Sequence, residues 1–366
     1  QVMMQPLPAS DLILFEGMPN ALYSFQFDIQ QPIFTWGKLT KGVKIFSAVA
    51  DVKALQLSST KKQQSFHLEG NLATLYYLLQ MEKLLEEQNN YATRLVQLSK
   101  EAEKNGMLLK QDVLEAEMQA ALVPVSMANL QANKSNILQN LQRMTGLSDL
   151  LPENIAFVPD DEYFENFAKI EFSVFKDSAL APEREAISIV DKLYEIAEIT
   201  HTVAKDSIYW KPDIALQISF GLQGNMEKLF KGERDLKNDL VADFTLGIKT
   251  TVWDGGKKLN QINRALSEKQ IAQIEGVDAK SAIIQELTVQ YNALQMALLK
   301  IQYQQLKIST ADSDIERKEK LVQSGYGSER EVLTAKISKI TEQITLLQER
   351  INLALATNTI RGLTEL

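Results

Sequence analysis

The sequence contains no cysteine and only two histidines, His67 and His201. The absence of cysteine excludes disulfide bonds, thiolate metal sites and cysteine nucleophiles. The two histidines lie far apart in the chain, so a multi-histidine metal site is not expected. We find no phosphate-binding loop, dinucleotide fingerprint or nucleophile elbow. The sequence therefore predicts that the protein is not an enzyme and that it needs no cofactor.

Long apolar runs and an excess of positive charge are also missing. No run of 18 or more apolar residues occurs, which excludes a membrane-spanning helix. The net charge is −8 and the sequence pI is about 5.1. An acidic chain of this kind lacks the excess of positive charge that binds nucleic acid, so nucleic acid is not an expected partner.

Residues that break helices are nearly absent from two long segments. None of the nine prolines lies between residues 33 and 123, and none follows Pro212. From Lys257 to Ser324 the only glycine is Gly276. We therefore predict helices over 38–104 and 257–323, each about 100 Å long at a rise of about 1.5 Å per residue. Helices of this length are typical of a coiled coil or a helical barrel.

Each long helix is predicted to turn back at a glycine. Gly106 and Gly325 are expected to cap the two helices in a left-handed conformation. Helices that return from these turns are expected to run to about Met144 and Thr359, and Pro124 is expected to kink or break the first of them.

The start of the second returning helix also has a recognisable pattern. Ser328 is a candidate N-cap, and Glu331, three positions later, is expected to complete a capping box.

The two hairpins are related by a constant offset of 219 in the residue numbering, called the repeat offset below. This offset pairs Gly106 with Gly325 and Asp112 with Glu331, and the residues that follow also match. It also pairs Ile33-Phe34 with Val252-Trp253, and Gly37-Lys38 with Gly256-Lys257. One register kept from the first of these pairs to the last indicates an internal duplication.

Three segments alternate between apolar and polar residues, as strands with two different faces do. They are 21–33, 213–223 and 240–252. Strands of ten or more residues with this pattern occur in membrane β-barrels, and a half-buried soluble sheet alternates in the same way. Three or four strands cannot close a barrel alone, and lipid tolerates no open sheet edge. If the strands cross a membrane, several copies of the chain must therefore share one barrel.

Taken together, these residues resemble the TolC-like outer-membrane efflux protein family. The resemblance lies in the junction 210–216 (WKPDIAL), in the strand exits 31–34 and 252–256, and in the two turns with their following helices. It covers nearly the whole chain. It implies an α+β membrane protein: a homotrimer whose twelve strands form one outer-membrane β-barrel in outer-membrane lipid, continued by a long α-helical barrel in the periplasm.

The resemblance also implies a function and partners. The expected protein is a passive exit duct of a tripartite efflux or secretion system, which docks with a periplasmic adaptor and an inner-membrane transporter. Adaptor contacts carry over to the residues of the two turns. These are Asn105, Gly106 and Met107 in the first hairpin, and Ser324, Gly325 and Tyr326 in the second.

The resemblance further implies an aperture gate at the same end of the helices. Its acidic positions carry over to Asp112, Glu115 and Glu331. The arginine that pairs with them in the family falls at Gly327 here, with Arg330 nearby, and a second acid falls at Thr334. A plainer interpretation of the three acids also stands: they compensate the positive end of each helix dipole.

The repeat offset defines the expected domains. The first copy comprises an outer-membrane strand and external loop at 1–34 and a helical hairpin at 35–147. An equatorial linker region and a helix follow at 148–211, the helix itself predicted at about 182–210. The second copy has a strand pair with an external loop at 212–253 and a hairpin at 254–366. By this arithmetic the first copy lacks its opening helix and most of one strand, so we expect a longer mature protein. The alternative that remains is a soluble coiled-coil scaffold or adaptor-type structural protein.

Overall fold

The fold is known from a computed structural model that describes residues 22–207, 211–225, 240–251 and 253–366. The chain divides into two compact units, which are described separately. The helical unit comprises 51–192 and 274–366, and the strand unit comprises the remaining described residues. Trp210 and Val252 lie outside the described residues, as do residues 1–21 and 226–239, where the external loops expected within 1–34 and 212–253 fall.

Two helices of equal length follow the segments that lack breakers. Helix α1 spans Lys38–Lys104 and α8 spans Lys257–Gln323, both as predicted. The returning helices are also equal in length, with α2 at Lys110–Thr145 and α9 at Glu329–Thr364. None of the helices in the described part of the chain combines the length and apolarity that crossing a membrane requires.

Pro124 lies inside α2 without ending it. The prediction of a break was therefore wrong, because packing of α2 against α1 holds the helix on both sides of the missing N–H. Val123, next to the proline, and Leu130, further along the helix, are both buried in the helical unit. Burial of this kind outweighs the local cost of one proline, which is about 3 kcal/mol.

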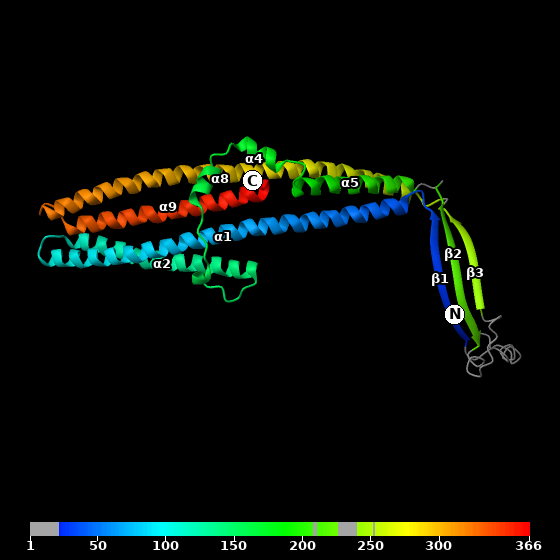
Figure 1. The fold of residues 1–366 in the computed structure, drawn as a ribbon, viewed down its shortest axis with the longest axis horizontal. Helices are drawn as coiled ribbons and strands as arrows, with labels where there is room; N and C mark the ends of the chain where they lie inside the picture. The colour runs from blue at the N-terminus through cyan, green and yellow to red at the C-terminus, as the bar shows by residue number, and fades with distance from the viewer. Residues whose placement is uncertain (1–21, 208–210, 226–239, 252) are drawn as a thin grey trace, which may run out of the picture. The chain divides into compact units, whose positions relative to one another are not determined.

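In the helical unit the four long helices lie side by side in the order α2–α1–α9–α8 (Figure 1). Ion pairs bridge each neighbouring pair of helices: Lys134 with Glu82 at 2.7 Å, Arg361 with Glu69 at 2.7 Å, and Lys300 with Glu349 at 3.0 Å. Helices α2 and α8 are therefore the two edges of this layer.

The largest apolar core lies where residues 148–181 cross the long helices. This stretch, predicted only as a linker, contains the short helix η2 (Pro152–Asn154), α3 (Asp161–Phe167) and α4 (Phe172–Ala179). Phe164, Phe167 and Phe175 are buried there with Leu294 of α8 and Ile351 of α9. Truncation of one such ring to alanine costs about 3–5 kcal/mol, so the crossing contributes strongly to the stability of the helical unit.

The last helix to be placed is α5 (Glu185–Asp206), close to the helix predicted at about 182–210. Glu185, its first residue, belongs to a charged cluster with Lys62 of α1 and Glu365 at the end of α9. The Lys62 ammonium lies 2.5 Å from Glu185 and 2.9 Å from Glu365, and Arg184 lies 2.9 Å from Glu365. This cluster joins three segments of the helical unit that are distant in sequence.

The cluster makes the stability of the protein depend on pH. The hydrogen bonds that Glu185 makes with the Glu365 carboxyl and with the Lys62 ammonium lower the pKa of Glu185 to about 2. A carboxylate with a lowered folded pKa stabilises the fold above its unfolded pKa and loses that contribution as the pH falls towards the folded value. We expect the thermal midpoint of the full chain to fall between about pH 4.5 and pH 2, and Glu185→Gln to remove part of this fall.

The measurement is thermal unfolding followed by circular dichroism at several pH values. Glu183→Gln is the matched control, because Glu183 is an exposed carboxylate just before the helix. Identical pH profiles for the wild type and Glu185→Gln would contradict the role of the cluster.

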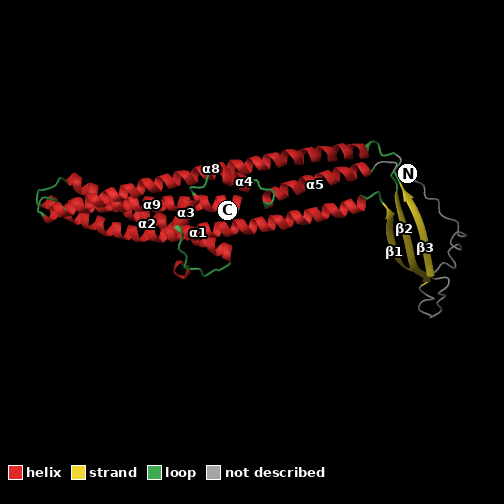
Figure 2. Cartoon of the chain, turned by 45° about the horizontal axis from the view of Figure 1, so that its top comes forward, coloured by secondary structure: helices red, strands yellow, loops and turns green. Residues whose placement is uncertain are grey.

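In the strand unit, β1 (Leu22–Phe34), β2 (Asp213–Asn225) and β3 (Leu240–Lys249) form one antiparallel sheet in the order β1-β2-β3 (Figure 2). The alternating segments are thus confirmed as strands. The register places Phe27 opposite Phe220, and Ile218 opposite both Ile29 and Phe244. The apolar residues of all three strands therefore share one face.

That apolar face is uncovered. Phe25, Phe27, Phe244, Leu246 and Ile248 each leave 66–70% of their surface exposed. The opposite face carries polar and small residues, among them Gln26, Gln217 and Thr245. In water, such a face would cost about 25 cal/mol for each square ångström of apolar surface, so it calls for an apolar environment.

Aromatic and basic groups gather at the end of the sheet next to α1. The Trp36 indole donates a hydrogen bond to the Pro212 carbonyl at 3.0 Å, and its ring packs edge-on against Phe34 at 5.0 Å. The Lys211 ammonium lies 5.6 Å from the Trp36 ring centroid. Aromatic rings at the end of an apolar sheet face are typical of the interface between lipid and water.

Residues with positive φ recur at the repeat offset. Those in the described chain are Trp36, Gly37, Gly106 and Gly146, and then Gly255, Gly256, Gly325 and Glu365. Each member of the first group precedes its counterpart in the second by that same offset. The same backbone turns thus occur at equivalent places in both halves, including two where the glycine of one half is replaced in the other.

Candidate functional site

Both predicted turns end their helices in the same way. Gly106 has a φ of 68°, its N–H donates to the Glu103 carbonyl, and the Met107 N–H donates to the Ala102 carbonyl, both at 2.9 Å. This pair of bonds is a Schellman motif, and the left-handed residue that it needs is most easily glycine.

The second turn repeats the motif. Gly325 has a φ of 77°, its N–H donates to the Val322 carbonyl, and the Tyr326 N–H donates to the Leu321 carbonyl, both at 3.0 Å. The predicted glycine caps are therefore confirmed. The two hairpins end in turns of the same geometry, each of which presents the residue after the glycine to its surroundings.

The turns expose large apolar side chains. Met107 is 74% exposed and Tyr326 is 88% exposed. The remaining predicted contact residues, Asn105, Gly106, Ser324 and Gly325, are also exposed. Leu109, which the sequence analysis did not single out, is 72% exposed; an apolar residue inside a polar turn was the signal available. Exposed apolar residues on a rigid turn are suited to binding another protein.

Asp112 lies in the first turn of α2. The helix begins at Lys110, so Asp112 is its third residue, and its carboxylate accepts a hydrogen bond from the Leu109 N–H at 3.1 Å. This contact is the plainer role that the sequence analysis left open: compensation of the helix N-terminus. Glu115 lies one turn further on and is exposed, with the Gln111 amide 3.4 Å from its carboxylate.

The start of α9 differs in part from the prediction. Ser328 is the N-cap as predicted, but its hydroxyl accepts from the Arg330 N–H at 3.3 Å. Ser328 is therefore confirmed as the N-cap, but the predicted capping box with Glu331 is wrong. Glu331 is exposed, and its carboxylate has no ionic partner among the described residues.

Arg330 binds to the first hairpin. Its Nε donates to the Ser99 hydroxyl of α1 at 3.0 Å, and Ser99 is fully buried. Arg94 of α1 also forms an ion pair with Glu329 at 3.1 Å. Within one chain, Arg330 therefore joins the second turn to α1. No sequence signal pointed to Ser99, because a buried serine inside a helical stretch has no distinctive pattern.

Gly327 is enclosed by the turn that it completes. Its N–H donates to the Leu321 carbonyl at 3.1 Å, and a Cβ atom at this position would lie 2.8 Å from the Val322 nitrogen. This is the position at which the TolC-like pattern has arginine. No side chain fits there without movement of the backbone, so the turn of this chain is built around glycine.

We expect Gly327→Ala to destabilise the second turn by about 1–3 kcal/mol, the usual cost of overpacking. Hydrogen exchange of the amides around residues 321–327 should become faster. Gly42→Ala is the control, because a Cβ there meets nothing within 4 Å and alanine favours the helix. Unchanged exchange in Gly327→Ala would show that the turn adjusts at no cost.

No metal or cofactor site is evident in the part of the chain that the structure describes. No three histidine, cysteine or acidic side chains converge there. His201 is buried in α5 and His67 lies in the middle of α1, in different units.

Comparison with known proteins confirms the resemblance to the TolC-like outer-membrane efflux family. Residues 204–364 match the family described as outer membrane efflux protein. This is a family of efflux proteins rather than enzymes, which confirms the prediction that the chain is not an enzyme and supports an outer-membrane location. No protein of curated function matches the chain by sequence.

Solved structures show the same fold over nearly the whole chain. The outer membrane protein VceC of Vibrio cholerae is 16% identical, with 94% of this chain and 86% of VceC covered and a TM-score of 0.71. The CmeC outer membrane channel of Campylobacter jejuni is 12% identical, with coverages of 97% and 79% and a TM-score of 0.71. The open MtrE outer membrane channel of Neisseria gonorrhoeae is 13% identical, with coverages of 97% and 82% and a TM-score of 0.62.

Proposed function

We propose that the protein is the outer-membrane exit duct of a tripartite efflux or secretion system, because residues 204–364 carry the sequence of an outer membrane efflux protein and the fold matches that of outer membrane channels. It conducts substrates passively from an inner-membrane transporter, across the periplasm and the outer membrane. The observation that carries the proposal is the uncovered apolar face shared by β1, β2 and β3.

This sheet face distinguishes a membrane protein from a soluble scaffold. A soluble coiled-coil protein would leave Phe27, Phe244 and Ile248 in water, at exposures of 66%, 68% and 70%. In a membrane barrel the same side chains contact lipid and the polar face lines the interior. The aromatic groups at Phe34 and Trp36 then lie at the level of the lipid headgroups.

Unpaired strand edges require several copies of the chain. Among the described strands β1 and β3 each pair on one side only, and lipid supplies no hydrogen bonds to an open edge. We propose a homotrimer with a twelve-stranded barrel. Such a barrel takes four strands from each copy: the three described strands and a fourth, which is the strand that the repeat offset predicts to be mostly missing from the first copy.

The helical layer supports the same assembly. Its two edge helices each carry an exposed apolar stripe on the side away from the layer. The stripe of α2 is Leu114, Met118 and Val125, and that of α8 is Val289, Met296, Leu299, Tyr303 and Leu306. Because the two edges differ, the α2 edge of one copy meets the α8 edge of the next, and a head-to-tail contact of this kind closes into a ring. The result is a barrel of helices in the periplasm.

We further propose that the chain arose by internal duplication. Equal helix lengths in the two halves, and backbone turns that recur at the repeat offset, support this origin.

The turns are the proposed docking and gating end of the duct. The exposed apolar residues Met107, Leu109 and Tyr326 would contact a periplasmic adaptor. The exposed acids Glu115 and Glu331 would form rings of negative charge around the aperture in a trimer. Asp112 and Arg330 are engaged within the chain, so they would need to exchange partners to take part in a gate.

The proposal is tested with the purified protein in detergent. We expect a trimer that is heat-sensitive on denaturing gels and that forms conducting channels in a planar bilayer. A protein that remains a monomer and stays soluble without detergent would rule out the trimeric duct.

A further inference from the structure

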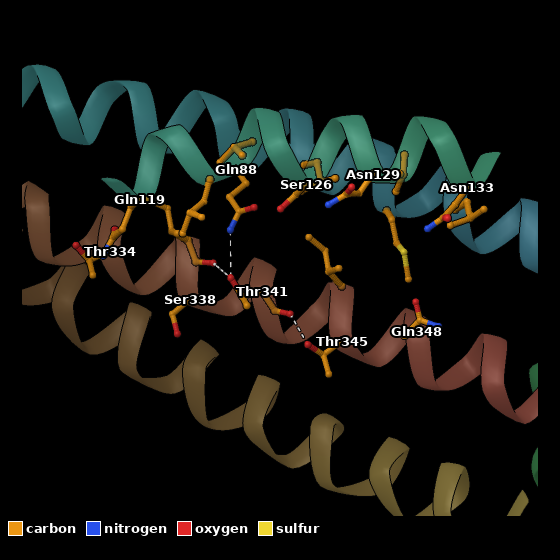
Figure 3. A pocket seen from close by; sticks show the side chains of 18 residues that line it. Gln88, Gln119, Ser126, Asn129, Asn133, Thr334, Ser338, Thr341, Thr345 and Gln348 are labelled. Carbon is orange, nitrogen blue, oxygen red and sulfur yellow. Dashed lines mark hydrogen bonds between the residues drawn. The ribbon is translucent and has the colours of Figure 1, made fainter. Parts of the chain in front are cut away.

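A groove of about 700 Å³ runs along the helical unit between α2 and α9, with α1 as its floor (Figure 3). Its volume lies within the range of sites for small molecules, about 300–1,000 Å³. None of its 18 lining residues is ionisable, although charged residues make up 23% of the chain. Four other pockets along the described chain each include charged side chains.

The groove has an apolar floor and polar walls. Leu78, Met81 and Leu85 of α1 form the floor, together with Val123 of α2 and Ile337 of α9. They belong to the buried cores of the helical unit, so the floor is held by packing on the other side of the layer. A rigid apolar floor of this kind favours the body of an aromatic or aliphatic molecule.

The polar side chains of the walls are all amides or hydroxyls, and the apolar residues Leu122 and Leu130 of α2 and Ile344 of α9 complete the lining. Gln88 of α1 donates a hydrogen bond to the Thr341 hydroxyl of α9 at 3.1 Å, and Thr345 donates to the Thr341 carbonyl at 2.9 Å (Figure 3). The other polar groups that face one another across the groove make no hydrogen bond to a described part of the chain. They are Gln119, Ser126, Asn129, Asn133, Ser338 and Gln348.

We propose that this groove binds neutral amphiphilic small molecules. Amides and hydroxyls both donate and accept, so they satisfy neutral polar groups of either kind. An ionic molecule would lose hydration in the groove and find no counter-charge, which disfavours it. A neighbouring copy is not the expected occupant, because the exposed apolar stripes of α2 and α8 that would receive it contribute no residue to the lining of the groove. That the bound molecules are exported substrates rests on the proposed function; the binding itself does not.

The lack of cysteine allows a direct test. Ser338→Cys places a single thiol in the groove, and Ser309→Cys places one on the exposed surface of α8 outside it. Each variant is reconstituted in lipid nanodiscs, and its alkylation by N-ethylmaleimide is timed with and without a probe. The neutral probe is N-phenyl-1-naphthylamine, and 8-anilino-1-naphthalenesulfonate is its anionic counterpart.

We expect the neutral probe to slow alkylation of Ser338→Cys at least fivefold and to leave Ser309→Cys unchanged, with little effect of the anionic probe. Asn129→Asp, added to Ser338→Cys, should reduce this protection. Gln131→Glu makes the same change of amide to acid on α2 outside the groove and should not. The proposal would be overturned if alkylation slowed equally at both cysteines. It would also be overturned if the two probes protected Ser338→Cys equally, or if neither probe protected it.

The same preparations separate the two hypotheses. Trimers that conduct but show no protection would disprove the groove as a binding site and leave the duct intact. Protection in a chain that forms no conducting trimer would contradict the proposed function alone, because the groove is formed within one chain.

Discussion

Phe244→Arg is expected to prevent assembly of the protein in the outer membrane. Phe244 lies in the middle of β3, opposite Ile218 of β2, and is 68% exposed on the apolar face. An arginine facing lipid near the middle of a bilayer costs about 2–4 kcal/mol. A trimer carries three copies of the substitution, so the combined cost is on the order of 10 kcal/mol, comparable to the whole stability of a typical domain.

The measurement is the amount of heat-sensitive trimer in the outer-membrane fraction of expressing cells. Thr245→Arg is the matched control, because the next residue of the same strand points to the opposite face and lies opposite Gln217. In a barrel that face lines the interior, where a charge changes conductance more than assembly. If both variants assembled equally well, the apolar face would not be in contact with lipid.

Val125→Cys combined with Leu306→Cys is expected to link neighbouring copies into covalent dimers and closed trimers. Val125 on α2 is as far along the chain from Gly106 as Leu306 on α8 is from Gly325, so the two lie at the same level above their turns. Both belong to the exposed apolar stripes of the edge helices. A head-to-tail interface brings the α2 edge of one copy against the α8 edge of the next.

The products are separated on a denaturing gel after treatment with a short bismaleimide. The single variants Val125→Cys and Leu306→Cys are the controls, and neither should form cross-links, because a head-to-tail ring does not bring a residue next to its own copy. No other thiol in these 366 residues interferes, since the sequence contains no cysteine. Dimers from either single variant would indicate a two-fold interface and contradict the ring.

Much of the local structure could be predicted because its causes are local. The extents of α1 and α8 follow from the absence of proline and the scarcity of glycine, and their ends follow from Gly106 and Gly325, which satisfy the last carbonyls in a left-handed turn. The strands follow from alternation, since successive side chains of a strand point to opposite faces.

Where several local outcomes have similar energy, the predictions failed. Pro124 was expected to kink or break α2; the break does not occur, because the apolar side of the helix packs in the helical unit, and the kink stays a prediction. The capping box at Ser328 required a hydrogen bond whose alternative, with the Arg330 N–H, differs by one position and little energy. Arg330 itself is positioned by Ser99, which belongs to the other hairpin and is distant in sequence.

The sequence by itself determined the long helices, the glycine turns, the two-faced strands and the repeat offset that relates the two halves. Only the tertiary structure decided which helix lies beside which, that Arg330 contacts α1, and that α1, α2 and α9 enclose a groove without charge. The physical reason is that a stripe of apolar residues shows that a helix face will be buried but not what buries it. The partner is chosen by shape and by ion pairs between distant segments, such as Arg361 with Glu69, which exist only once the chain has folded.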